Sequence, residues 1–72
     1  MKNENLYALG AKIRFERVKK GISQEALADL TGLSRRAISC IECGTNDPKY
    51  TTLLSISNAL KITLLELLNT KF

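Results

Sequence analysis

The sequence contains no histidine and only two cysteines among its 72 residues. Histidine is the commonest metal ligand and the most frequent general acid and base. Its absence therefore argues against a metal centre and against a nucleophile activated by an imidazole base. Cys40 and Cys43 stand three positions apart, too close on a helix to staple distant parts of a fold. This excludes a disulfide-dense secreted scaffold. We therefore expect reduced thiols, a cytoplasmic setting and no cofactor.

Long apolar runs and catalytic groupings are also missing. The richest apolar stretch, Ile62 to Leu68, is interrupted by Thr63 and Glu66, so we expect no membrane span, which needs about 18 apolar residues. There is no basic-then-apolar leader, no Ser/His/Asp set and no phosphate-cradling glycine loop. The chain is also too short to enclose a substantial pocket. These absences predict a protein that is not an enzyme and has no evident small-molecule ligand.

Acidic residues are scarce, and the resulting positive charge is unevenly spread. The net charge is +4. Residues 1–36 contain eight Lys or Arg against four Asp or Glu, whereas residues 37–72 contain three of each. A basic half joined to a neutral, apolar half indicates one face for a polyanion and another for packing or self-association.

What the sequence does contain is helical periodicity. Apolar residues recur three and four positions apart, without sustained alternation or a β-branched run of strand length. N-cap residues, glycines and one turn-like segment at residues 45–48 divide the pattern, and Thr63 with Glu66 fits a capping box. The predicted helices run from Asn5 to Lys20, from Ser23 to Gly32, from Ser34 to Gly44, from Thr51 to Leu60, and from Thr63 onward. Residues 1–72 are therefore predicted to form one all-α, five-helix domain.

The second and third predicted helices form a helix-turn-helix pattern. Gly32 supplies the turn between them, and Ala28 and Ala37 are small enough to let the two helices cross closely. Leu33 and Ile38 then fix the angle between the helices. In such a unit the second helix projects from the protein surface. A single helix is narrow enough to enter the major groove of double-stranded DNA.

The predicted reading helix begins near Ser34. With Ile38 and Ile41 inward, its outward residues are Arg35, Arg36, Ser39 and Cys40. Arginine reads guanine through paired hydrogen bonds to O6 and N7, so two arginines at this end of the helix are placed to reach base edges.

Contacts to the DNA backbone are expected where helices begin. Free amides and the positive end of the helix dipole suit phosphate. The residues expected there are Ser23, Gln24 and Ser34, although capping is the main role of the two serines. Asn46 and Lys49 lie just past the reading helix and are expected to touch the adjacent strand.

At this point the sequence resembles the Xre/Cro type, lambda-repressor-like helix-turn-helix family. The residues that carry the likeness are Ile22 to Ala28, Gly32 to Arg35, Ile38, Ser39, Ile41, Glu42, Pro48, Leu53, Ile56, Ala59, Leu60 and Glu66 to Leu68. The likeness covers nearly the whole chain, roughly from Leu9 to Leu68. As a freestanding domain of this size, the sequence is similar to the controller proteins of restriction–modification systems and to compact phage-type repressors.

The resemblance implies a transcriptional regulator that binds a two-fold symmetric operator as a homodimer. It implies that Gln24 matches a phosphate-contacting glutamine, and that Arg35, Arg36, Ser39 and Cys40 match base-facing positions. It also implies a buried ion pair between Arg17 and Glu42. Arg17 continues the apolar stripe of the first helix, so it should need a partner if buried.

Leucines near the C-terminus are more numerous than one subunit needs. Leu64, Leu67 and Leu68 can face the core, whereas Leu54, Leu65 and Phe72 lack obvious cover. We assign Leu54, Leu65, Leu68 and Phe72 to a self-complementary dimer interface on a C-terminal dimerisation helix.

Two alternatives stay open at this stage. The leucine-rich face could belong to a protein-binding module, such as an antitoxin or anti-regulator, in which the arginines are incidental. The Cys40 and Cys43 pair could sense oxidants, although small non-reactive residues are the simpler interpretation.

Overall fold

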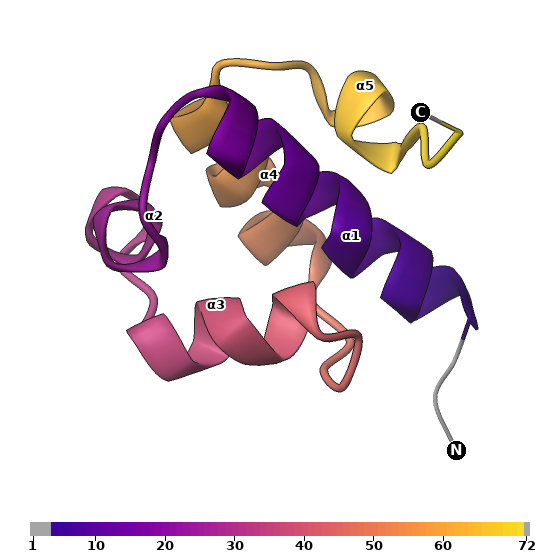
Figure 1. Ribbon diagram of the computed structural model, residues 1–72, viewed down its shortest axis with the longest axis horizontal. Coiled ribbons are helices and arrows are strands. Elements are labelled where there is room, and N and C mark those ends of the chain that lie inside the picture. Colours follow the sequence, from indigo (N-terminus) through magenta and orange to yellow (C-terminus); the bar gives the residue numbers. More distant parts are fainter. Residues whose placement is uncertain (1–3, 72) are drawn as a thin grey trace.

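The computed structural model describes residues 4–71, and all the regular secondary structure in that range is α-helical. The five helices are α1 (Glu4–Lys19), α2 (Gln24–Thr31), α3 (Arg35–Glu42), α4 (Tyr50–Leu60) and α5 (Leu64–Leu68). Helix α1 crosses the front of the molecule, with α3 below it, α2 at one side, α4 behind and α5 above (Figure 1). The predicted all-α, five-helix class is confirmed, and each predicted helix is present to within two residues at its start.

Local sequence signals set the helix boundaries. The hydroxyls of Ser23, Ser34 and Thr63 each accept a hydrogen bond from an amide three residues ahead, at 3.0 Å. This satisfies one of the amides that a helix start leaves unpaired. Gly32 ends α2 in the left-handed conformation, with φ of +75°, which glycine adopts without strain.

One part of the capping prediction is wrong. Thr63 caps α5, but in residues 4–71 the carboxylate of Glu66 makes no return hydrogen bond to the amide of Thr63. Glu66 is exposed, so its carboxylate is solvated by water at little cost.

The core lies where α1, α2, α3 and α4 meet and where α5 closes over α1 and α4. Its buried apolar residues are Ile13, Leu27, Ala28, Ile38, Ile41, Ile56, Leu60 and Leu67. Leu64 packs partly against them, but Leu68 is 48% exposed, so its predicted core position is wrong. Helix α5 has only five residues, and one and a half turns do not bury three leucines on one face. Within residues 4–71, no helix combines the length and apolarity that crossing a membrane requires.

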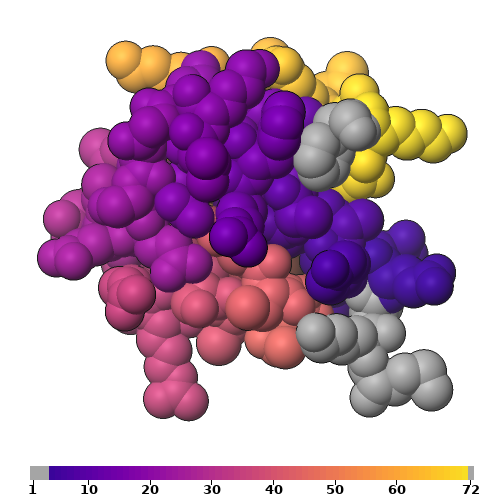
Figure 2. Space-filling view, in the orientation of Figure 1, coloured from indigo at the N-terminus to yellow at the C-terminus, as the bar shows by residue number. Residues whose placement is uncertain are grey.

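Helix α1 approaches the C-terminal end of α3 very closely at Gly10. A Cβ atom built at Gly10 would overlap the carbonyl of Ile41 and would lie 2.6 Å from the carbonyl oxygen of Glu42. A Cβ atom built at Gly44, just past α3, would lie 2.7 Å from the Cα atom of Tyr7. The space-filling view shows α1 beside the C-terminal part of α3 and the segment that follows it (Figure 2).

An ion pair on α1 was not predicted. Lys12 Nζ lies 2.9 Å from Glu16 Oε2, and both side chains are almost fully buried. The hydrogen bond from Lys12 holds the pKa of the Glu16 carboxyl below its ordinary value, against the opposing effect of burial. Pairs four residues apart usually lie on helix surfaces, so the spacing alone gives no signal that this pair is buried.

The close contact at Gly10 gives a test of the helix packing. We expect Gly10→Ala to lower the free energy of unfolding by about 1–3 kcal/mol, because the added methyl group pushes α1 away from α3. At an open helical position the same change would instead stabilise the protein by about 1 kcal/mol. Urea denaturation measures the difference, and a gain in stability would show that α1 and α3 do not approach this closely.

Candidate nucleic-acid interface

Helices α2 and α3 form the two-helix corner that the sequence predicts. The turn between them is held by Thr31, whose hydroxyl donates to the carbonyl of Leu27 at 2.8 Å. The amide of Leu33 donates back to the same hydroxyl at 3.4 Å. Ala28 and Ile38 are buried where the helices cross. The corner is therefore fixed by local hydrogen bonds of the turn and by core packing together.

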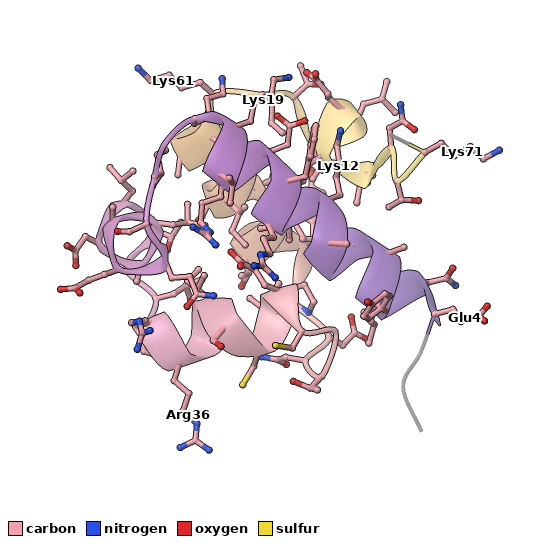
Figure 3. The ribbon with its side chains drawn as sticks, viewed as in Figure 1. Glu4, Lys12, Lys19, Arg36, Lys61 and Lys71 are labelled. Carbon is pink, nitrogen blue, oxygen red and sulfur yellow. The ribbon has the colours of Figure 1, made fainter. Side chains whose placement is uncertain are left out.

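Helix α3 turns its arginines outward. Arg35 and Arg36 are exposed, and the side chain of Arg36 extends away from the body of the protein (Figure 3). Ser39 and Cys40 are half-buried on the same helix. The exposed side of α3 thus presents two guanidinium groups at its N-terminal end and a smaller, less accessible surface behind them.

A buried carboxylate joins three segments behind this surface. Glu42 Oε2 accepts a hydrogen bond from Arg17 Nε at 2.7 Å, and Oε1 accepts one from Arg17 Nη2 at 3.1 Å. Only 11% of the Arg17 side chain and 3% of the Glu42 side chain are exposed. Arg17 Nη1 also donates to the carbonyl of Ile22 at 2.7 Å. The ion pair therefore ties α1 to the end of α3 and to the segment that leads into α2.

Gln24 belongs to the same cluster, which sequence reasoning missed. Its Nε2 donates to Glu42 Oε1 at 3.1 Å, and the residue is half-buried. An amide nitrogen carries two hydrogens, so one remains for another acceptor. The predicted phosphate donor is thus anchored by the residue that anchors Arg17. No sequence signal connects residues 18 positions apart on different helices.

The remaining predicted DNA contacts lie on the loop between α3 and α4. Asn46 and Lys49 are both exposed, and Lys49 occupies the N-cap position of α4 without a side-chain cap hydrogen bond. Thr45 ties the start of this loop to α3, through a hydrogen bond from its hydroxyl to the carbonyl of Cys40 at 3.1 Å.

The two cysteines are both free thiols, with Cys40 half-buried and Cys43 exposed at the C-cap of α3. Among residues 4–71, no cluster of three or more histidine, cysteine, aspartate or glutamate side chains is arranged to hold a metal ion.

The predicted dimer residues differ in exposure. Leu65 is 83% exposed and Leu68 is 48% exposed on α5. Leu54 on α4 is half-buried. Phe72 lies outside the described residues. In Figure 1 α5 lies on the side of α1 away from α3, so the two helices lie on different sides of the molecule.

Comparisons with known proteins agree with this geometry. The helix-turn-helix family HTH_3 matches residues 13–67. The restriction–modification controller protein C.AhdI of Aeromonas hydrophila has a similar structure, with a TM-score of 0.89 and 35% identity over 90% of this chain and 98% of that one. The DNA-binding domain of the P22 c2 repressor gives a TM-score of 0.81 and 38% identity over 83% of this chain and 79% of that one.

A curated relative gives the same result at the level of sequence. The HTH-type transcriptional regulator YqaE of Bacillus subtilis is 40% identical over 48 residues, which are 67% of this chain. The chain spans only 41% of the length of that relative.

The buried ion pair gives a test of the site's framework. We expect Glu42→Ala to lower the free energy of unfolding by about 3 kcal/mol, because it leaves the guanidinium of Arg17 buried without its counter-ion. Glu25→Ala, at an exposed position in the first turn of α2, is the control and should lower stability by no more than about 1 kcal/mol, the contribution of a carboxylate near a helix N-terminus. Thermal and urea unfolding measure both variants, and equal effects would mean that Glu42 is solvated.

Proposed function

The chain belongs to the helix-turn-helix family, and on that premise we propose that it is a transcriptional regulator that binds a two-fold symmetric DNA operator as a homodimer. Its reading element is α3, which enters the major groove with its N-terminal end leading. The observation that carries the proposal is the pair of exposed guanidinium groups, Arg35 and Arg36, on the outer side of a helix whose opposite side is locked into the core.

Base reading falls to the side chains at the start of α3. Arg35 and Arg36 are long enough to reach guanine, and each good contact contributes about 1–3 kcal/mol of discrimination. Ser39 and Cys40 lie behind them on the same helix and are half-buried. They contact bases only when α3 lies fully inside the major groove, so their role is to improve the complementarity between the helix and the groove.

Backbone contacts flank the reading helix on both sides. Ser23 and Ser34 cap their helices, so their side chains are engaged. The first amides of a helix have no partner within it, so those of α2 and α3 can donate to phosphate. Gln24 offers the second hydrogen of its side-chain amide to a phosphate. Asn46 and Lys49, just past α3, contact the backbone of the adjacent DNA strand. Phosphate contacts set the position of the protein on the duplex and base contacts set its sequence preference.

Self-association is supported by the exposed leucines of α5. A single module of this size reads only a short sequence, and a dimer doubles the contacts by placing two reading helices about 34–36 Å apart on one face of the duplex. Leu65 and Leu68 supply apolar area for a symmetric contact, and we assign to it the half-buried Leu54 of α4, a helix that packs against α5. This contact leaves the outer side of α3 uncovered.

Selection of bound sites from random duplexes tests the reading role. We expect Arg36→Ala to lose preference at one or two positions of each half-site, at a cost of about 1–3 kcal/mol per position. Lys49→Ala is the control, because a phosphate contact should weaken binding to all sequences alike and reduce the dependence on salt by about one ion. A uniform loss with Arg36→Ala would contradict base reading. Affinity that does not fall with salt would favour the protein-binding module instead.

Sedimentation analysis tests the proposed dimer. We expect Leu65→Asp to shift the protein toward monomer by about tenfold or more in dissociation constant, because the carboxylate would be desolvated in the contact. Leu30→Asp is the matched control, since Leu30 is 63% exposed on α2, and α2 lies apart from α5 (Figure 1). If both variants dimerise like the parent chain, α5 is not the contact surface.

A further inference from the structure

Helix α1 has a second apolar stripe on the side turned away from the core. Tyr7 and Val18 are 56% and 58% exposed, and Phe15 is also exposed, whereas Ile13 on the inner side is fully buried. A surface helix of a globular protein ordinarily has one apolar face and one polar face. The core covers the first stripe of α1, so the second stripe is surface that a partner would cover.

The outer stripe forms one wall of a groove. The groove measures about 630 Å³, and its other wall is the C-terminal end of α3, at Glu42 and Cys43. Figure 2 shows the face on which α1 meets this end of α3. The groove is formed by packing, because the contact at Gly10 fixes how closely the two helices approach. Neither the proposed reading side of α3 nor the leucines of α5 contribute to its lining.

The spacing of the α1 wall matches what one helix presents to another. Tyr7, Ala11, Arg14 and Val18 all line the groove, and they follow one another at intervals of four, three and four residues. This is the alternation of a coiled-coil seam, in which side chains of a facing helix insert between those of the first. From Tyr7 to Val18 the seam runs for about 16 Å, or three helical turns. An occupant of this length is a helix rather than a compact small molecule.

The charges at the rim select the chemistry of the occupant. Arg14 and Lys19 line the groove and are exposed, and Lys19 Nζ lies 5.8 Å from the centre of the Phe15 ring. The carboxylate in the lining, Glu42, is already paired with Arg17. A second copy of α1 would bring the same cations against this rim, whereas an acidic helix would pair with them.

We propose that the groove between α1 and the C-terminal end of α3 docks an acidic amphipathic helix of another protein. Apolar side chains of that helix insert along Tyr7, Ala11 and Val18, and its carboxylates pair with Arg14 and Lys19. The proposal does not rest on DNA binding, because the groove lies beside the proposed reading surface and uses different residues.

A synthetic helical peptide of about four turns is the probe, with leucines at the seam positions and glutamates flanking them. Titration of the peptide into the ¹⁵N-labelled chain should give saturable amide shifts on the outer side of α1 and at Cys43. Val18→Glu should weaken binding by about tenfold or more, because it places a carboxylate in the apolar seam. Leu30→Glu, an equally exposed apolar position on α2, is the matched control and should leave binding unchanged.

A second peptide with the same leucines but flanking lysines tests the charge. It should bind at least about tenfold more weakly, since Arg14 and Lys19 repel it. Equal affinity for the two peptides would overturn the acidic partner. The absence of saturable shifts, or shifts that Val18→Glu leaves intact, would overturn the docking site. Self-association of the peptide-free chain that Val18→Glu abolishes would show that the occupant is a second copy, and the proposal would fail. Circular dichroism verifies that both variants are folded.

Discussion

The carboxylate of Glu42 is the constraint on which the arrangement of α1, α2 and α3 depends. It accepts hydrogen bonds from the guanidinium of Arg17 and from the amide of Gln24. A buried ion pair gains little over apolar packing, because both charges lose their hydration, and it is tolerated only when its hydrogen bonds are satisfied. The three helices are therefore held in the one arrangement that satisfies this carboxylate. Under the proposed function, the same arrangement sets the start of α2 and the angle of α3 against the duplex.

Helix α3 is held at both ends by different means, and this is why its outer side is free. At its N-terminal end Ser34 caps the helix and α2 packs across it. At its C-terminal end Gly10 admits the backbone of α1, and Glu42 binds Arg17. Neither restraint uses the outer side of the helix. A rigid helix with an unoccupied outer side is what a groove-reading element requires, because disorder there would add an entropic cost to each base contact.

The fold was largely predictable because its signals are local. Helical periodicity, serine caps and the glycine turn each act within a few residues, and all five helices follow from them. The predicted burial of Leu68 was wrong because the side chains that a five-residue helix buries depend on how it packs against α1 and α4. The burial of the Lys12 and Glu16 pair could not be foreseen either, because it depends on how distant parts of the chain pack against α1.

The candidate site likewise has one part that follows from local sequence and another that depends on distant segments. The outward placement of Arg35 and Arg36 follows from the periodicity of one helix. The bond from Gln24 to Glu42 requires the geometry of three segments and has no signature in the sequence.

The two proposals meet at Glu42, which suggests how they would be coupled. An occupant of the α1 groove lies against Glu42, and Glu42 holds both Arg17 and Gln24. Two binding events influence one another only if one of them changes the free energy of the state that the other selects. A partner that leaves the Glu42 cluster intact would bind without altering DNA affinity. A partner whose carboxylate drew Arg17 away from Glu42 would release Gln24 and the segment at Ile22, and it would weaken the phosphate contacts at the start of α2. Coupling between the groove and the duplex would therefore depend on whether the partner competes for that one guanidinium.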